Sequence, residues 1–203
     1  LTVTQLTPTV STTIHDAAHA AITSANVGAT VHDSVTVTGS GATPTGNVTV
    51  SWFTNGTCTG TAAATSAATA LASGTVDVTA FPQTLSAAGS YSFRAAYAGD
   101  AAYTSATGPC EPLTVNRLTP TVATTIHNAA HAAVTSVNVG TVVHDSVTVT
   151  GSGATPTGNV TVSWFTNGTC TGTAAATSAA TALASGTVDV DRKSTRLNSS
   201  HGY

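Results

Sequence analysis

Histidine pairs at a fixed spacing are the feature of this sequence with the most obvious chemical potential. His15 and His19 form an H-x-x-x-H pair, and the pattern recurs at His127 and His131. On an α-helix, two histidines at this spacing lie on one face and can share a metal ion. The surrounding sequence, IHDAAHAAITS, contains no glutamate or cysteine and is expected to be a loop. We therefore interpret these histidines as surface residues and predict no metal site.

A second histidine motif pairs an imidazole with a neighbouring carboxylate. His32 is followed by Asp33, and the dipeptide recurs as His144 and Asp145. Asp33 has the same strand parity as Val35, because side chains two residues apart point to one face of a strand. We expect Asp33 at the entrance of a strand, where its carboxylate accepts hydrogen bonds from loop amides.

Catalytic chemistry has little support in the residues. Serine, histidine and aspartate all occur, but none lies in a nucleophile elbow. Glycosidases use paired carboxylates, and the chain has a single glutamate, Glu111. Asp100, in the segment AGD, is expected to be a turn residue. Calcium binding is the alternative, but one carboxylate supplies too few of the roughly six to eight oxygen ligands that a calcium ion takes. The sequence predicts no catalytic residues, no cofactor and no enzyme activity.

A tandem repeat organises the positions of all these residues. Residues 31–78 recur letter for letter as residues 143–190, a shift of 112 positions. Repeats this similar indicate an array of modules rather than one irregular domain. Upstream of the identical segment the two copies differ at Gln5/Arg117, Ser11/Ala123, Asp16/Asn128, Ile22/Val134, Ala25/Val137, Ala29/Thr141 and Thr30/Val142.

The repeat divides the chain into four parts. We predict the end of a preceding repeat at residues 1–4, a complete repeat at 5–116, a second repeat at 117–190 that lacks its last two strands, and a non-native tail at 191–203. The tail segment DRKSTRLNSSH resembles the translation of a sequencing-library adapter. Without the tail, two arginines face seven acidic residues, a net charge of −5. Such an acidic body is a poor ligand for nucleic acid.

Two cysteines fall within the complete repeat. Cys58 follows the turn at Asn55 and Gly56, and Cys110 precedes the last expected strand. A disulfide between them would join the ends of two strands and would fit an extracellular module, whereas two free buried thiols are the alternative. Cys170 repeats Cys58, but its counterpart of Cys110 would lie beyond residue 203, so we expect it to be unpaired.

Composition and periodicity predict an all-β fold. Only 6% of residues are charged and 5% are aromatic, and no apolar run approaches the roughly eighteen residues of a membrane span. Val48, Val50 and Trp52 share one face of an expected strand at residues 47–54, which ends at a hairpin signal, Asn-Gly. The aromatic residues expected in the core are Trp52, Tyr91 and Phe93.

The complete repeat contains about seven expected strands. One strand is expected at residues 9–14, followed by a loop from His15 to Gly28, and others near 34–38, 90–98 and 113–115. The alanine-rich segment 61–73 has no apolar stripe and is expected to be a loop with a short edge strand. About seven strands in roughly 110 residues predict an antiparallel two-sheet sandwich.

Five segments of the repeat resemble one protein family. LTPTV, VHDSVTVTG, PTGNVTVSWF, AAGSYSFRAAYAGDAAY and CEPLTV are similar to the bacterial immunoglobulin-like repeats of long secreted and cell-surface proteins, over residues 1–190. The resemblance implies an immunoglobulin-like antiparallel β-sandwich. Trp52 and Tyr91 resemble the core tryptophan and tyrosine corner of such sandwiches. The usual Cys-Trp-Cys order is absent, because Phe93 occupies the second cysteine position and Cys58 follows the tryptophan.

The resemblance also implies a role. We expect a structural or spacer repeat, such as part of an adhesin stalk, located outside the cell or on its surface, with neighbouring repeats of the same chain as its partners. The alternative is a glycan- or protein-binding module that uses its end loops. Phe53, expected on the opposite face of its strand from Trp52, is the exposed aromatic candidate for binding. No nucleic-acid partner and no membrane insertion are expected.

Overall fold

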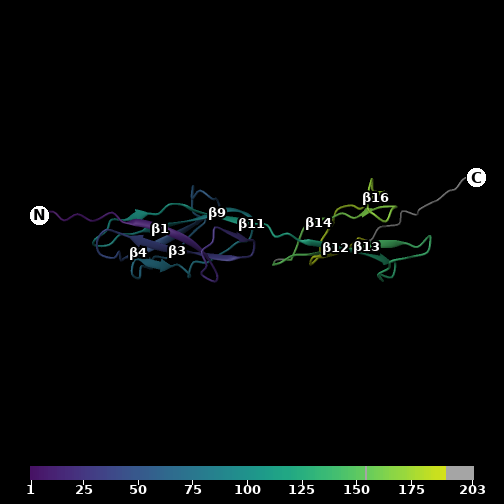
Figure 1. The fold of residues 1–203 in the computed structure, drawn as a ribbon, viewed down its shortest axis with the longest axis horizontal. Coiled ribbons are helices and arrows are strands. Elements are labelled where there is room, and N and C mark those ends of the chain that lie inside the picture. The colour runs from purple at the N-terminus through teal and green to yellow at the C-terminus, as the bar shows by residue number, and fades with distance from the viewer. Residues whose placement is uncertain (154, 191–203) are drawn as a thin grey trace, which may run out of the picture. The chain divides into compact units, whose positions relative to one another are not determined.

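The computed structural model describes residues 1–153 and 155–190, which form two compact units divided between Leu118 and Thr119 (Figure 1). Both units are built from β-strands. Among the described residues, no helix has the length and apolar character needed to cross a bilayer. The tail predicted at 191–203 lies outside the described residues.

The smaller sheet of the first unit is centred on β3 (Thr30–Thr38). β3 pairs antiparallel with β1 (Thr9–Asp16) along its whole length and with β7 (Thr75–Asp77) near its middle. β8 (Gln83–Thr84) pairs with the first residues of β3. Valines that alternate with polar residues along β3 give this sheet one apolar face and one polar face.

The larger sheet is centred on β9 (Gly89–Tyr97). β9 lies between β4 (Asn47–Phe53) and β11 (Glu111–Asn116), and both pairings are antiparallel. β11 also pairs in parallel with β2 (Ser24–Asn26). Short strands complete the sheet: β5 (Ala64–Thr65) and β6 (Thr69–Ala70) on β4, and β10 (Ala106–Thr107) on β9.

One hydrophobic core lies between the two sheets. Val35 from β3 and Val50 from β4 are fully buried in it. Trp52 is 6% exposed, stacks on the half-buried ring of Tyr91 at 5.2 Å and contacts the buried ring of Phe93 at 4.5 Å. The inward positions of each strand are two residues apart, so strand parity explains which side chains enter the core.

The sequence-based expectation for Phe53 is wrong. Phe53 is only 2% exposed, although it points away from Trp52. The guanidinium of Arg94 lies 5.3 Å from the centre of the Phe53 ring. The loop after β4 returns over the same face, where the Cys58 amide donates to the Ser92 hydroxyl at 3.2 Å. This cover removes Phe53 as an exposed aromatic residue for binding.

The second unit is built around a smaller cluster of buried residues. β13 (Val143–Thr150) lies between β12 (Thr121–Asn128) and β18 (Thr187–Val190), and Val147, Val149 and Val190 form its buried cluster. Trp164 is 42% exposed. The remaining described strands form two short antiparallel pairs. These are β14 (Asn159–Val160) with β17 (Thr181–Ala182), and β15 (Ser163–Trp164) with β16 (Ala176–Thr177).

Candidate functional site

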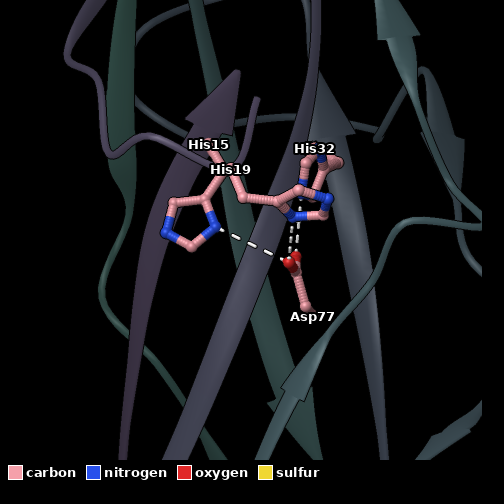
Figure 2. Close-up of side chains that lie close together, drawn as sticks. All are labelled: His15, His19, His32 and Asp77. Carbon is pink, nitrogen blue, oxygen red and sulfur yellow. Dashed lines mark hydrogen bonds and ion pairs between the residues drawn. The ribbon is translucent and has the colours of Figure 1, made fainter. Parts of the chain in front are cut away.

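Three histidines and an aspartate meet on the polar face of the smaller sheet (Figure 2). His15, near the end of β1, is directly opposite His32 on β3, so the two imidazoles project from the same side. Asp77, the last residue of β7, pairs with Ser34, which is two positions from His32 and on the same face. His19 reaches the group from the turn that follows β1. We call these four residues the first histidine cluster.

The carboxylate of Asp77 lies at the centre of this cluster. Its Oδ2 atom is 2.6 Å from Nδ1 of His19 and 3.8 Å from Nδ1 of His15. Its Oδ1 atom is 2.9 Å from Nε2 of His32. One nitrogen or oxygen from each of the four residues lies within 4.8 Å of the other three.

The cluster buries polar atoms that have no hydrogen-bond partner. His32 is 5% exposed although it lies on the outward face, because the other cluster members cover it. Nδ1 of His15, Nε2 of His32 and Oδ1 of Asp77 are buried without a hydrogen bond of acceptable geometry. The His32 and Asp77 atoms are close enough for an ion pair, but their angles do not suit a hydrogen bond.

A tight turn delivers His19 to the cluster. The Asp16 carboxylate accepts hydrogen bonds from the amides of Ala18 and Ala20, both at 2.9 Å. His19 has a φ of 61°, in the left-handed region that few residues other than glycine adopt. The ring centres of His19 and His32 are 4.9 Å apart as a result of this turn.

The second repeat builds the same arrangement from His127, His131, His144 and Asp189, the second histidine cluster. The Asp189 carboxylate lies 2.8 Å from Nδ1 of His131 and 3.1 Å from Nε2 of His144. These two ring nitrogens face each other at 3.2 Å. The geometry therefore recurs in a unit whose core is smaller.

The same turn forms in the second repeat, although the residue that accepts its hydrogen bonds is different. Asn128 replaces Asp16, and its side-chain oxygen accepts hydrogen bonds from the amides of Ala130 and Ala132 at 3.0 Å. His131 has a φ of 57°, close to that of His19. Either side chain supplies the oxygen that this turn needs.

The expectation of a loop beginning at His15 is wrong by two residues, because β1 extends to Asp16. His19 lies in the exposed turn after β1, as expected, whereas His32 is buried. Asp77, 45 residues after His32, was not connected to them. One signal was present in the sequence, because Asp77 alternates with Val76 and Val78 and is thereby marked as outward-facing.

Asp33 lies on the opposite face of β3 from His32 and is buried beside Glu111. Burial raises the pKa of the Asp33 carboxyl to about 8, with the negative charge of Glu111 adding to the effect. Glu111 accepts a hydrogen bond from the Ile14 amide at 3.0 Å. The backbone amides of Thr13 and Ser34 act in the opposite direction on the pKa of Asp33. Asp33 is thus an inward-facing strand residue, and its burial favours the neutral carboxyl over the carboxylate.

Asp100 organises the corner that follows β9. Its carboxylate accepts hydrogen bonds from the amide of Thr45 at 2.8 Å and the hydroxyl of Thr45 at 2.9 Å. The amides of Ala102 and Tyr103 donate to its other oxygen at 2.7 and 2.8 Å. These bonds, with the Thr45 amide foremost, hold the pKa of Asp100 below its ordinary range. Asp100 therefore holds the turn after β9 against the loop that contains Thr45.

Cys58 and Cys110 form a disulfide, which confirms the predicted pairing. Their Cα atoms are 5.6 Å apart, and the bridge spans 52 positions of sequence. It ties the loop after β4 to the residue that precedes β11. Cys170 is a free, exposed thiol.

Comparison of the chain with protein-family models, with curated proteins and with solved structures finds no match. The architecture therefore defines the structural class of the chain. It is a disulfide-bonded all-β protein. Disulfides persist in oxidising, extracellular-type environments.

Proposed function

We propose that this chain is a piece of a spacer array, in which immunoglobulin-like repeats extend a long bacterial protein that is secreted or displayed on the cell surface. An adhesin stalk is one such structure. The observation that carries the proposal is the placement of the two ends of the first repeat, which lie at opposite ends of its central strand.

The chain enters the first repeat beside the last residues of β9. The amide of Leu6 donates to the carbonyl of Ala102 at 2.8 Å, and the amide of Thr104 donates to the carbonyl of Leu6 at 3.0 Å. These partners belong to the corner that follows Tyr97, where β9 ends. The entry point is therefore at the carboxyl end of β9.

The chain leaves the first repeat at the other end of the same strand. Val115 on β11 pairs with Gly89, the first residue of β9. A nine-residue strand spans about 30 Å at about 3.3 Å per residue. A module that is entered at one end and left at the other adds its own length to the polypeptide, which is what a spacer requires.

Strand order supports the immunoglobulin-like part of the proposal. In immunoglobulin sandwiches the first, second and fifth strands share one sheet, and the third, sixth and seventh share the other. β1, β3 and β7 form one such group here, and β4, β9 and β11 form the other. The Tyr91 hydroxyl donates to the Ala87 carbonyl at 3.0 Å, as a tyrosine corner does.

Small-angle X-ray scattering of one, two and three complete 112-residue repeats in tandem tests the spacer role. The maximum dimension is expected to grow by a constant amount of about 30 to 40 Å for each added repeat, the length of its strands plus end loops. A control with a flexible glycine–serine linker between repeats should grow less regularly. Growth typical of one compact globule would contradict the proposal.

The binding alternative has less support from the first repeat. Phe53, the aromatic residue that sequence reasoning offered for it, is covered by Arg94. Probing a glycan array with the intact chain is expected to show no selective retention. Selective binding that is lost on substitution of end-loop residues would favour the alternative.

A further inference from the structure

We propose that each repeat binds one Zn²⁺-type divalent transition-metal ion. In the first repeat the ligands are His15, His19, His32 and Asp77. In the second they are His127, His131, His144 and Asp189. The ion acts as a structural staple on the polar face of the smaller sheet, and this role is separate from the spacer function.

The chemical composition of the first cluster selects this class of ion. Three imidazole nitrogens and one carboxylate oxygen suit zinc and its first-row neighbours. Calcium and magnesium are held by oxygen ligands, and the first cluster offers only the Asp77 carboxylate. The ligand set therefore excludes the hard cations.

The distances in the cluster fit a single ion. Bonds of about 2.0 to 2.1 Å in a tetrahedral site place neighbouring donor atoms about 3.4 Å apart. The separations from Asp77 to the three histidines are 2.6, 2.9 and 3.8 Å. The four donor atoms lie within 4.8 Å of one another, so side-chain rotations that move each donor by about 1 Å would bring them to a common centre.

The unpaired polar atoms supply an independent reason. Nδ1 of His15, Nε2 of His32 and Oδ1 of Asp77 are buried without a suitable hydrogen bond. Buried polar groups in proteins are nearly always paired. A cation among them would give these atoms the partner that they lack.

The location of the cluster argues against a role in the core. His32 lies on the outward face of β3, alternating with the inward residues Val31, Asp33 and Val35. Although it lies on this outward face, His32 is only 5% exposed. It is covered by His19 and Asp77, two polar residues brought to it by a left-handed turn and a separate strand.

The same four residue types recur in the second unit at identical spacings of 4, 13 and 45 positions. The segment that carries His15 and His19 is the part of the repeat where the two copies differ, yet both histidines are retained. Asp16 is replaced by Asn128, which keeps the turn. The chain therefore contains two copies of the cluster, one in each unit.

Four protein ligands leave no open coordination position, which is the arrangement of structural rather than catalytic zinc. The ion would join the end of β1, the turn after it, the start of β3 and the end of β7. It would therefore stabilise one end of the smaller sheet in each repeat.

Isothermal titration of the metal-free, full-length chain with ZnCl₂ tests the proposal. The wild-type chain is expected to bind two ions. His19→Ala, at an exposed position, should reduce this to one, and the double variant His19→Ala/His131→Ala should bind none. Removal of one ligand is expected to weaken its site by at least about 100-fold, since even outer-shell substitutions cost 10- to 100-fold.

His201→Ala is the matched control, because His201 is the one histidine of the sequence that is not proposed as a ligand in either repeat. This variant should still bind two ions. A second readout is Co²⁺ in place of Zn²⁺, which should give the strong visible absorption of tetrahedral coordination in the wild type and lose it in the double variant.

Three results would overturn the proposal. These are no zinc binding by the wild-type chain, unchanged binding by a folded double variant, or loss of an ion in His201→Ala. The first result would identify each cluster as an ion-pair network alone. Circular dichroism of the double variant establishes that it is folded, and the spacer role would stand whichever result is obtained.

Discussion

Trp52 and Tyr91 stack with their ring centres 5.2 Å apart and their planes 8° from parallel. Trp164 has the same sequence neighbours as Trp52 but is 42% exposed. We expect Trp52→Ala to lower the free energy of unfolding of the first unit by about 3 to 5 kcal/mol, as for other buried aromatic residues. Trp164→Ala should cost less than about 1 kcal/mol. Urea denaturation of both variants measures the difference, and equal costs would contradict the observed burial.

The disulfide should stabilise the first unit substantially. Closure of a loop with a sequence separation of 52 residues contributes about 4 kcal/mol in the chain-entropy model. The variant Cys58→Ser/Cys110→Ser is expected to lose a similar amount in chemical denaturation. Cys170→Ser serves as the control, because this thiol is exposed and unbridged. A double variant as stable as this control would show that the bridge adds nothing.

Backbone amides of the second unit should exchange faster than their equivalents in the first. β4 is hydrogen-bonded to β9 on one side and to β5 and β6 on the other. Among the described residues, β14 and β15 each have one short partner strand. NMR hydrogen exchange separates the two copies by chemical shift. We expect residues 159–164 to exchange at least about tenfold faster than 47–52, and similar protection would contradict this account.

Asp100 should make the first unit sensitive to acid. Hydrogen bonds led by that of the Thr45 amide lower the pKa of Asp100 in the folded state. As pH falls, the unfolded chain takes up the proton first, so the stabilisation is complete above about pH 4 and is lost as pH falls through the folded-state pKa. Asp100→Asn is expected to lower the melting temperature at pH 7 and to flatten its dependence on pH below about 4.

Asp16→Asn is the matched control for this acid prediction. Asparagine already occupies the equivalent position, Asn128, in the second repeat and makes the same turn. Its melting temperature at pH 7 should therefore stay close to that of the wild type. Calorimetry across the acid range compares the two variants. An equal loss of stability in both would show that Asp100 has no special role.

The sequence by itself determined the features that depend on neighbouring residues. Alternation of apolar and polar residues with a period of two marks β-strands, and it indicated that Trp52 points inward, where it is 6% exposed. Residues 5–116 contain two cysteines, so a disulfide between them was predicted with two free thiols as the alternative, and the structure contains the disulfide. These inferences required only local geometry or a count.

Only the tertiary structure decided which polar residues meet. Asp77 reaches His32 because β7 pairs with β3 in a register that no local pattern specifies. Phe53 is buried because the loop after β4 and Arg94 cover its face. Strand parity tells which side of a sheet a residue occupies, but contacts on that side depend on strand pairing and loop closure between residues far apart in sequence. For this reason the histidine clusters, whose members lie up to 62 positions apart in sequence, are apparent only in the folded chain.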